Sequence, residues 1–252
     1  MSTAVLLSGG LDSAVLLADE ASRGEVQPIF VSTGLAWEPA ERSMITALLA
    51  RRPLAQAVGR LITLSVDMRD VYAATHWAVQ GKPPAYHTPD EDVYLPGRNI
   101  ILLGKAGVYC AAARIERLVL GTLAHNPFPD ATPEFRDAMA RALSLGLAHE
   151  LRIDAPFAGV SKADVIRRGV ALGVPFELTL SCMSGTGYSG TGLGYSGTGL
   201  GEKTNRDPSP TDRDPSPAHC GLCSKCRERH DAFLEAGVTD PTGYVDSRFV
   251  QA

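Results

Sequence analysis

The sequence lacks the features that would place the protein in a membrane or on nucleic acid. None of its apolar runs approaches the ~18 residues that a spanning helix needs, and no basic segment with an apolar run opens the chain. Lys and Arg number 24 against 28 Asp and Glu, which gives a formal net charge of -4. Nucleic-acid binding usually needs a surplus of positive charge. We therefore expect a cytoplasmic protein with a small-molecule substrate and no direct nucleic-acid or membrane partner.

Cysteine is also scarce, with five residues in 252, so its spacing is more informative than its number. Cys220, Cys223 and Cys226 form two overlapping Cys-x-x-Cys steps, and Cys182 is the candidate for a fourth ligand. This spacing suits one tetrahedral Zn²⁺, and we predict a structural zinc site. An iron–sulfur cluster, a redox dithiol and a nucleic-acid-binding zinc ribbon are the alternatives. Cys110 lies in an apolar helix and is expected to be a small buried hydrophobe.

The chain has enough apolar residues, 44%, to bury one sizeable core. Short apolar runs alternate with segments of helical spacing, which predicts βαβ units and a doubly wound, mainly parallel α/β sheet. We expect a nucleotide-binding domain over 1–178 and a small helical, zinc-binding lobe over 179–252. The expected strands are Ala4–Leu7, Val26–Ser32, Leu61–Val66, Leu118–Thr122 and Arg152–Pro156, and the expected helices are Ala14–Ala21, Glu41–Val58, Asn99–Ala113, Thr132–Leu145 and one from Ser161 to Gly169 or Gly173.

The stretch from about 184 to 217 differs from the rest of the chain. Tyr188–Gly194 is repeated identically as Tyr195–Gly201, and Thr204–Pro210 recurs with one change as Thr211–Pro217. Solenoid repeats are longer and have a hydrophobic face for stacking. We interpret this stretch as a flexible low-complexity insertion, with a hinged lid over the active site as the alternative.

A glycine-rich turn, Ser8-Gly9-Gly10-Leu11-Asp12-Ser13, lies between the first expected strand and helix. At such a place free N–H groups and the helix dipole favour an anion, and the serine hydroxyls can donate to phosphate oxygens. Asp12 would repel phosphate unless a divalent cation lay between them, so it predicts Mg²⁺. The turn is neither a Walker A loop nor a dinucleotide-binding motif. A plain glycine turn with a helix cap is the structural alternative.

This turn matches the Ser-Gly-Gly-x-Asp-Ser signature of the PP-loop ATP pyrophosphatases, which it resembles in sequence and position. The resemblance implies a fold like that of the adenine nucleotide alpha-hydrolases. It also implies cleavage of ATP between the α and β phosphates, with Asp12 and Ser13 in catalytic roles. The nucleotide contacts expected from the motif and its flanks are Leu7, Ser8, Gly9, Gly10, Leu11, Asp12, Ser13 and Leu17.

The phosphate loop and the C-terminal cysteines together resemble the 7-cyano-7-deazaguanine synthase family. Similar segments are Leu95–Asn99, Pro129-Asp130, Pro133–Phe135, Ser161–Asp164 and Leu172–Leu178 before Ser181-Cys182. The resemblance covers nearly the whole chain outside the repeats. It implies an ATP-dependent ligase that converts 7-carboxy-7-deazaguanine and ammonia to the nitrile with two ATP. The cofactors implied are ATP, Mg²⁺ and Zn²⁺, and a homodimer is possible.

Physical roles follow for four further positions. Arg98 could neutralise phosphate or carboxylate with its planar fork, and Lys162 at a helix start could offset pyrophosphate charge. We predict catalytic roles for both. Asp130 and Glu134 could accept hydrogen bonds from a guanine-like edge, although Glu134 is also well placed for the helix dipole. The predicted substrate contacts are Arg98, Asn99, Asp130 and Glu134.

Two segments depart from the family's usual pattern, Ser32–Glu38 and Ala124–Phe128. Both follow strands, where the substrate crevice of an α/β sheet is expected. They leave open a related ligase or amidotransferase that acts on a different carboxylate or stops at the amide. A zinc-containing nucleotide-binding module without turnover is a third hypothesis, which the intact Asp12 makes less attractive. Transfer RNA thiolation or lysidine formation would need a basic surface.

Overall fold

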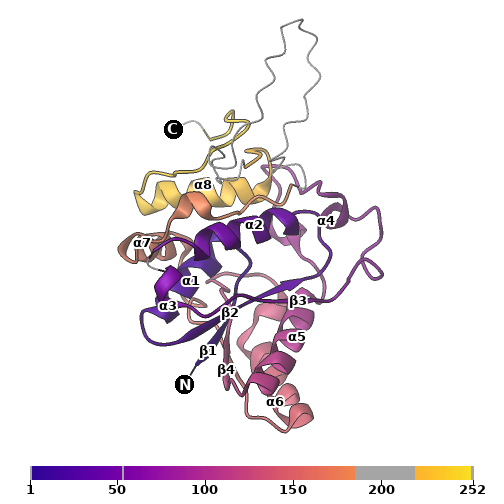
Figure 1. Ribbon diagram of the computed structural model, residues 1–252. Helices are drawn as coiled ribbons and strands as arrows, with labels where there is room; N and C mark the ends of the chain where they lie inside the picture. The colour runs from indigo at the N-terminus through magenta and orange to yellow at the C-terminus, as the bar shows by residue number, and fades with distance from the viewer. Residues whose placement is uncertain (1, 53, 185–218, 251–252) are drawn as a thin grey trace, which may run out of the picture.

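The computed structural model describes residues 2–52, 54–184 and 219–250 (Figure 1). Within them, five parallel strands form one sheet in the order β3-β2-β1-β4-β5. The predicted α/β class and parallel sheet are confirmed. The strands are β1 (Thr3–Leu6), β2 (Val26–Ser32), β3 (Ile62–Ser65), β4 (Arg117–Val119) and β5 (Arg152–Asp154).

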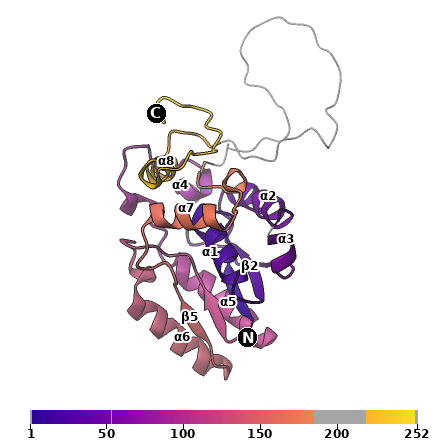
Figure 2. The same cartoon turned by 90° about the vertical axis from the view of Figure 1, so that its left-hand side faces the viewer.

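Helices cover both faces of this sheet, because alternate strand residues are apolar on each side. Val5 and Phe30 pack with α1, α2, α7 and α8 on one face, while Ala4 and Ile29 pack with α5 and α6 on the other (Figures 1 and 2). The helices are α1 (Leu11–Ala21), α2 (Glu38–Leu49), α3 (Leu54–Ala57), α4 (Trp77–Gln80), α5 (Arg98–Ala113), α6 (Pro133–Leu147), α7 (Lys162–Ala171) and α8 (Ser224–Ala236), with short 3-10 turns η1 (Asp90–Val93), η2 (Pro129–Ala131) and η3 (Phe176–Leu178).

One predicted helix is wrong in extent. The expected continuous helix Glu41–Val58 is two helices, because α2 ends at Leu49 and α3 begins only at Leu54. The sequence has proline at position 53, and proline cannot donate the main-chain hydrogen bond of a helix interior. The other expected helices and strands differ from the structure by a few residues at their ends, where periodicity gives little information.

The sheet changes winding direction between β1 and β4, and loops at the carboxyl ends of these strands meet there. Parallel α/β sheets bind ligands at such a switch point. The phosphate loop follows β1, and Gly121 and Thr122 follow β4. In Figure 1 the C-terminal helix α8 lies at the end of the molecule opposite the start of β1.

The C-terminal segment shares the main core, since Ala232 and Phe233 of α8 pack with residues of β1 and α1. The division of the chain at residue 178 stays a prediction. The predicted low-complexity insertion lies outside the described residues, apart from Ser184. No described helix is both long and apolar enough to cross a membrane.

Candidate functional site

The phosphate loop leaves the start of α1 open. Gly10 is the N-cap residue, and no side chain of the described residues caps the helix there. The first N–H groups of a helix have no partner within it, and α1 is long enough to have a substantial dipole. The loop therefore presents donors and partial positive charge to any anion at this end of the sheet.

The loop's shape depends on its glycines and serines. Gly9 has φ +76°, and a Cβ there would lie 3.0 Å from the main-chain oxygen of Glu41 in α2. Ser13 Oγ lies 3.2 Å from both the main-chain nitrogen and the hydroxyl of Ser8, and it donates to the carbonyl of Gly10 over 3.0 Å. These bonds fix the hydroxyls of Ser8 and Ser13 within the loop. A larger residue at Gly9 would require α2 to move.

Asp12 combines an ion pair with an unused oxygen. Its Oδ2 lies 3.2 Å from Nζ of Lys162 in α7, while its buried Oδ1 has no hydrogen-bond partner among the described residues. Burial raises the pKa of Asp12, and Lys162 opposes that change. Burial alone would lower the pKa of Lys162, but Asp12 and Glu228 together raise it. An orphaned carboxylate oxygen is a suitable ligand for a hard divalent cation, so this site fits Mg²⁺.

The residues that follow β4 lie beside Asp12. A Cβ at Gly121 would lie 3.4 Å from the main-chain nitrogen of Ser13 and 3.5 Å from the carbonyl carbon of Asp12. The next residue, Thr122, has a buried hydroxyl without a hydrogen-bond partner in the described chain. Buried polar atoms are normally paired, so Asp12 Oδ1 and Thr122 Oγ1, which have no partner among the described residues, indicate a place built for a polar ligand.

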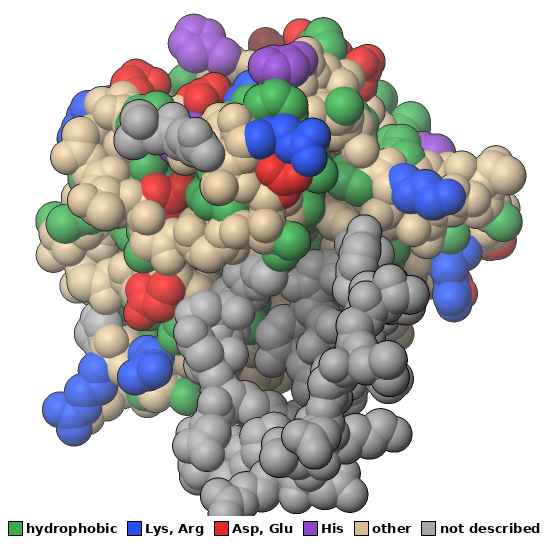
Figure 3. Space-filling model, turned by 90° about the horizontal axis from the view of Figure 1, so that it is seen from above, with side chains coloured by type: hydrophobic (Ala, Val, Ile, Leu, Met, Phe, Trp, Pro, Cys, Tyr) green, Lys and Arg blue, Asp and Glu red, His purple; other side chains and the backbone are tan. Residues whose placement is uncertain are grey.

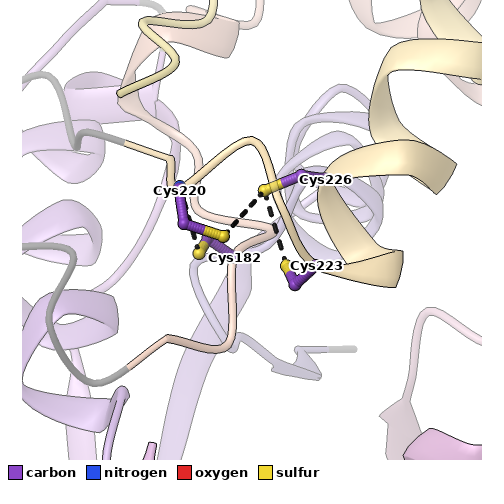
Figure 4. A group of neighbouring side chains, drawn as sticks. All are labelled: Cys182, Cys220, Cys223 and Cys226. Carbon is purple, nitrogen blue, oxygen red and sulfur yellow. Dashed lines mark hydrogen bonds between the residues drawn. The ribbon is translucent and has the colours of Figure 1, made fainter. Parts of the chain in front are cut away.

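The four predicted cysteine ligands converge on one point, as Figure 4 shows. Their sulfur atoms all lie within 4.8 Å of one another. Cys226 Sγ is 3.5 Å from Cys223 Sγ and 3.8 Å from Cys220 Sγ. A tetrahedral ion with metal–sulfur bonds of ~2.3 Å would place its ligands about 3.8 Å apart, whereas a disulfide needs ~2.05 Å. Cys182, Cys220, Cys223 and Cys226 can therefore hold one metal ion.

Main-chain nitrogen atoms lie close to the sulfur atoms of Cys182 and Cys220. The main-chain nitrogens of Ser184 and Cys220 lie 3.4 and 3.5 Å from Cys182 Sγ, and that of Leu222 lies 3.4 Å from Cys220 Sγ. Such donors stabilise thiolates and orient them. Cys110 is remote from the cluster in a different core and is fully buried, and burial raises the pKa of its thiol to about 12.

The cysteine cluster lies beside the phosphate loop. Cys182, Cys223 and Cys226 pack with Met44 of α2 and with Leu180, and the Leu180 N–H donates to the carbonyl of Gly9 over 2.8 Å. The segment that contributes the first cysteine is thus hydrogen-bonded to the phosphate loop, which contains Asp12. The two sites predicted separately from sequence form one continuous region.

Arg229 of α8 holds the same segment from within. It is fully buried and donates to Thr179 Oγ1 and the carbonyl of Phe176 over 2.8 and 2.9 Å. Its Nε donates to Thr242 Oγ1 over 2.5 Å and lies 3.6 Å from Asp240. Burial lowers the pKa of this guanidinium, which Asp240 counteracts. One side chain therefore joins η3, α8 and the C-terminal segment.

Arg98 begins α5 and lies with its guanidinium over the ring of Trp37, 5.9 Å from the ring centroid. Trp37 itself is buried and stacks on Trp77 at 5.6 Å. The Nε of Arg98 is buried without a partner in the described residues. Glu41 of α2 is near this cation: burial raises its pKa to about 8, Arg98 opposes the increase and Glu38 adds to it. The position suits an anion that would complete the pairing of Arg98.

Two of the other predicted substrate contacts, Asp130 and Asn99, are hydrogen-bonded to each other. Asp130 is buried, and its Oδ2 accepts from the main-chain N–H of Asn99 over 3.0 Å. The Asn99 amide in turn donates to the carbonyl of Asp130 over 3.0 Å. This pair fixes the start of α5 and with it Arg98. Glu134 is exposed in the first turn of α6, where the helix dipole favours a carboxylate. Their substrate contacts stay predictions.

The apolar residues predicted around the nucleotide belong to the core. The side chains of Leu7, Leu11 and Leu17 are almost completely buried in the cluster beneath α1. The Leu7 N–H is already bonded to the carbonyl of Ile29 over 2.8 Å. Direct contacts between these leucines and a nucleotide also stay predictions.

Sequence reasoning missed two charged residues on α8. Glu228 pairs with Lys162, and Lys225 lies 2.6 Å from Glu228. Burial would raise the pKa of Glu228, but Lys162 and Lys225 outweigh it and lower that pKa to about 2. Lys225 lies inside the second Cys-x-x-Cys step, and this position in the sequence could have indicated its role. A helix that begins at the cysteine cluster brings its charged residues close to the phosphate loop.

The surface seen in Figure 3 has scattered charges. On the part of this face that is not grey, Lys and Arg side chains are interspersed with acidic and apolar ones and form no single basic patch. This agrees with the overall charge of -4. A small-molecule substrate remains the better expectation than nucleic acid.

A parallel α/β sheet with Ser8–Ser13 at its switch point places the chain in the PP-loop-like class. The family model for the queuosine biosynthesis protein QueC matches residues 2–237, and the chain belongs to this enzyme family. The chain is similar to the 7-cyano-7-deazaguanine synthase of Methanopyrus kandleri, 33% identical over 97% of this chain and 99% of that one. The synthases of Methanoculleus marisnigri and Azoarcus sp. are each 31% identical, with 95% of this chain and 96% and 95% of theirs covered.

Solved structures give a weaker similarity. A crystal structure described as a predicted subunit of tRNA methyltransferase from Methanocaldococcus jannaschii has a TM-score of 0.43 and 15% identity, over 66% of this chain and 73% of that one. The family membership rests on the sequence comparisons.

Proposed function

We propose that the protein is an ATP-dependent carbon–nitrogen ligase that converts 7-carboxy-7-deazaguanine and ammonia to 7-cyano-7-deazaguanine. The observation that carries the proposal is the start of α1. Among the described residues no side chain caps this helix, and Asp12 beside Lys162 has a carboxylate oxygen without a hydrogen-bond partner. Membership of the QueC family and the names of the similar synthases support the choice of substrate.

In the first half of the reaction, a carboxylate oxygen of the substrate attacks the α-phosphorus of ATP and pyrophosphate leaves. Ammonia then attacks the acyl carbon, AMP leaves and an amide remains. In the second half, the amide oxygen attacks the α-phosphorus of another ATP, and pyrophosphate and one N–H proton leave. Loss of AMP with the remaining N–H proton then forms the nitrile. Both halves require the same charge neutralisation at the phosphates.

The chain's own residues suit these steps. Main-chain donors at the start of α1 and the hydroxyls of Ser8 and Ser13 would bind phosphate oxygens, and Lys162 would offset the charge of the leaving pyrophosphate. Asp12 and the phosphates would hold Mg²⁺, which would supply positive charge to the adenylyl group in transfer and to the leaving pyrophosphate. Arg98, whose Nε has no partner among the described side chains and main chain, would orient the substrate carboxylate or a phosphate.

For the cysteine cluster we propose structural zinc. Four thiol ligands fill a tetrahedral site and leave no position for substrate, and the sulfur separations suit that geometry. The cluster would then stabilise the segment next to the phosphate loop and take no part in bond making. Cytoplasmic location and a homodimer stay predictions.

A second candidate function is a QueC-like ligase that uses a different carboxylate or stops at the amide. The segment Ser32–Glu38, which departs from the family pattern, folds around its own glutamate at the end of β2. Glu38 accepts hydrogen bonds from Ser32 Oγ, from the N–H and hydroxyl of Thr33 and from the N–H of Gly34, over 2.6 to 3.1 Å. This carboxylate is thus occupied within the loop.

The test is release of pyrophosphate from ATP-Mg²⁺ with ammonia, with and without 7-carboxy-7-deazaguanine, with products identified by mass spectrometry. The proposal expects substrate-dependent release and a product lighter than the amide by one water. A reaction that ends at the amide would establish the second candidate in its amide-forming version. No pyrophosphate with this acid would overturn the proposed substrate.

A further inference from the structure

Four charged side chains of alternating sign connect the phosphate loop to the cysteine-bearing helix. Asp12 pairs with Lys162, Lys162 pairs with Glu228, and Glu228 pairs with Lys225. The side chains of Lys162 and Lys225 are 16% and 18% exposed, and those of Asp12 and Glu228 are 26% and 25% exposed. The pairs are therefore mostly shielded from water, where ion pairing is stronger than at an open surface.

Three helices contribute to this row of charges. Asp12 is in the first turn of α1, Lys162 is the first residue of α7, and Lys225 and Glu228 stand on either side of Cys226 in α8. The two oxygens of Glu228 are divided between the two lysines, Oε1 with Lys162 and Oε2 with Lys225. The cysteine cluster fixes the start of α8, and so it also sets where Glu228 lies.

The position of Lys162 matters because its ammonium competes for Asp12. Lys162 Nζ lies 3.2 Å from Asp12 Oδ2, while the Oδ1 of Asp12 has no hydrogen-bond partner in the part of the chain that the structure describes. If Glu228 were absent, the ammonium would have Asp12 as its remaining carboxylate partner here and would move toward it. The positive charge of Lys162 would then lie closer to a divalent cation at Asp12 and would repel it. Glu228 therefore keeps the Lys162 ammonium near the phosphate loop, while part of the Asp12 carboxylate stays available to a cation.

We propose that Glu228 is a positioning residue for Lys162, and that Lys225 fixes Glu228, so that Asp12 stays available to a divalent cation. The proposal rests on the proposed function in one respect, because that function assigns the cation to Asp12. It makes α8 an electrostatic support of the phosphate site as well as part of the cysteine lobe. A purely structural bridge between α7 and α8 would change stability but leave cation affinity untouched.

The experiment measures binding of Mn²⁺ together with α,β-methylene ATP to the full-length, zinc-loaded protein by titration calorimetry and by the Mn²⁺ resonance signal. Glu228→Gln removes the charge and keeps the shape, and Glu228→Asp keeps the charge. Glu235→Gln is the matched control, since Glu235 is an exposed residue of the same helix. Lys225→Met tests the outer lysine. Zinc content and the melting temperature are measured for every variant.

We expect Glu228→Gln to weaken Mn²⁺ binding about tenfold, Glu228→Asp to recover part of the loss, and Glu235→Gln to bind like the native chain. Lys225→Met should weaken binding less than Glu228→Gln. Unchanged Mn²⁺ affinity in both Glu228→Gln and Lys225→Met overturns the positioning role. If Glu228→Gln fails to fold, Glu228→Asp and Lys225→Met decide. Absence of any Mn²⁺-nucleotide binding by the native chain would instead overturn the proposed function.

Discussion

Leu180 donates its main-chain N–H to the carbonyl oxygen of Gly9 over 2.8 Å, and this bond joins the phosphate loop to the segment that leads into Cys182. Gly9 can accept it because its φ of +76° turns the loop sharply after β1. A change at the cysteine cluster therefore reaches the loop through main-chain atoms. Metal content, stability and nucleotide binding should be coupled, although the cluster would contact no substrate.

Replacement of Asp12 should separate catalysis from folding. Asp12→Asn keeps the shape of the side chain but removes the charge beside Lys162 and the orphaned carboxylate oxygen. We expect pyrophosphate release to fall by at least about a hundredfold, because charge stabilisation in such sites is worth several kcal/mol. The measurement is the initial rate of pyrophosphate formation.

The melting temperature of Asp12→Asn should stay close to that of the native chain, because Lys162 retains Glu228 as a partner. Asp137→Asn, at an exposed position of α6, is the matched control and should leave the rate unchanged. A native rate in Asp12→Asn would remove this residue from the mechanism.

Loss of one cysteine ligand should lower metal content and stability together. Cys223→Ser replaces a thiolate that lies 3.5 Å from Cys226 Sγ within the cluster. Because metal binding contributes directly to folding free energy, we expect substoichiometric zinc and a lower melting temperature. Elemental analysis and thermal unfolding measure the two quantities on the same sample.

Cys110→Ala provides the comparison, since Cys110 is buried in the opposite core and is not part of the cluster. It should keep full zinc content and lose only the small stability expected of a core thiol. A stable, zinc-free Cys223→Ser protein would refute the structural role of the cluster.

Local patterns were sufficient for much of the fold. The Gly-rich turn after Ala4–Leu7 and the apolar run at Val26–Ser32 specify their structures within a few residues, so these elements could be predicted. The cysteine spacing likewise predicted a cluster, and the structure brings Cys182 to it from 38 residues before Cys220. The predicted helix Glu41–Val58 is too long because apolar periodicity alone takes no account of the single proline at position 53.

The electrostatics of the site could not be read in the same way. Lys162 and Glu228 are 66 residues apart, and nothing near either residue indicates the other. Glu41 belongs to an ordinary amphipathic helix in sequence, yet it is buried next to Arg98 in the structure. Such pairs arise only when helices pack, and no local signal encodes them. For Asp130 the sequence predicted a substrate contact, whereas the structure shows its carboxylate accepting a hydrogen bond from the main-chain N–H of Asn99.

Arg229 should be among the residues on which folding depends most. Its planar fork reaches Thr179, the carbonyl of Phe176, and Thr242, all in a fully buried position. Lysine has a single ammonium and cannot satisfy acceptors in these separate directions. We expect Arg229→Lys to lower the free energy of unfolding by about 2–4 kcal/mol, measured by urea denaturation.

Arg248→Lys is the matched control for this substitution. Arg248 pairs with Asp246 at the surface, where its side chain is 65% exposed, so the change should stay within about 0.5 kcal/mol. Equal effects of the two substitutions would mean that Arg229 does not hold η3 and α8 together.

The buried Glu41 should make stability depend on pH. Burial raises its pKa from 4.5 to about 8 in the folded chain, against the effect of Arg98 and with help from Glu38. Between these two values the unfolded chain releases the proton while the folded chain keeps it. Stability therefore falls as pH rises through this window, and the cost persists above it. Each unit of pKa difference corresponds to about 1.4 kcal/mol, so a few kcal/mol are at stake.

Glu41→Gln cannot ionise and should escape this loss. Its advantage over the native chain in urea unfolding should be small near pH 4.5, grow as the pH approaches 8 and stay constant above that value. Glu177→Gln, at an exposed position in η3, should show no such divergence. Because both substitutions remove one carboxylate, their difference isolates the buried site. Parallel stability curves for Glu41→Gln and the native chain would show that Glu41 is ionised in the folded protein, held so by Arg98.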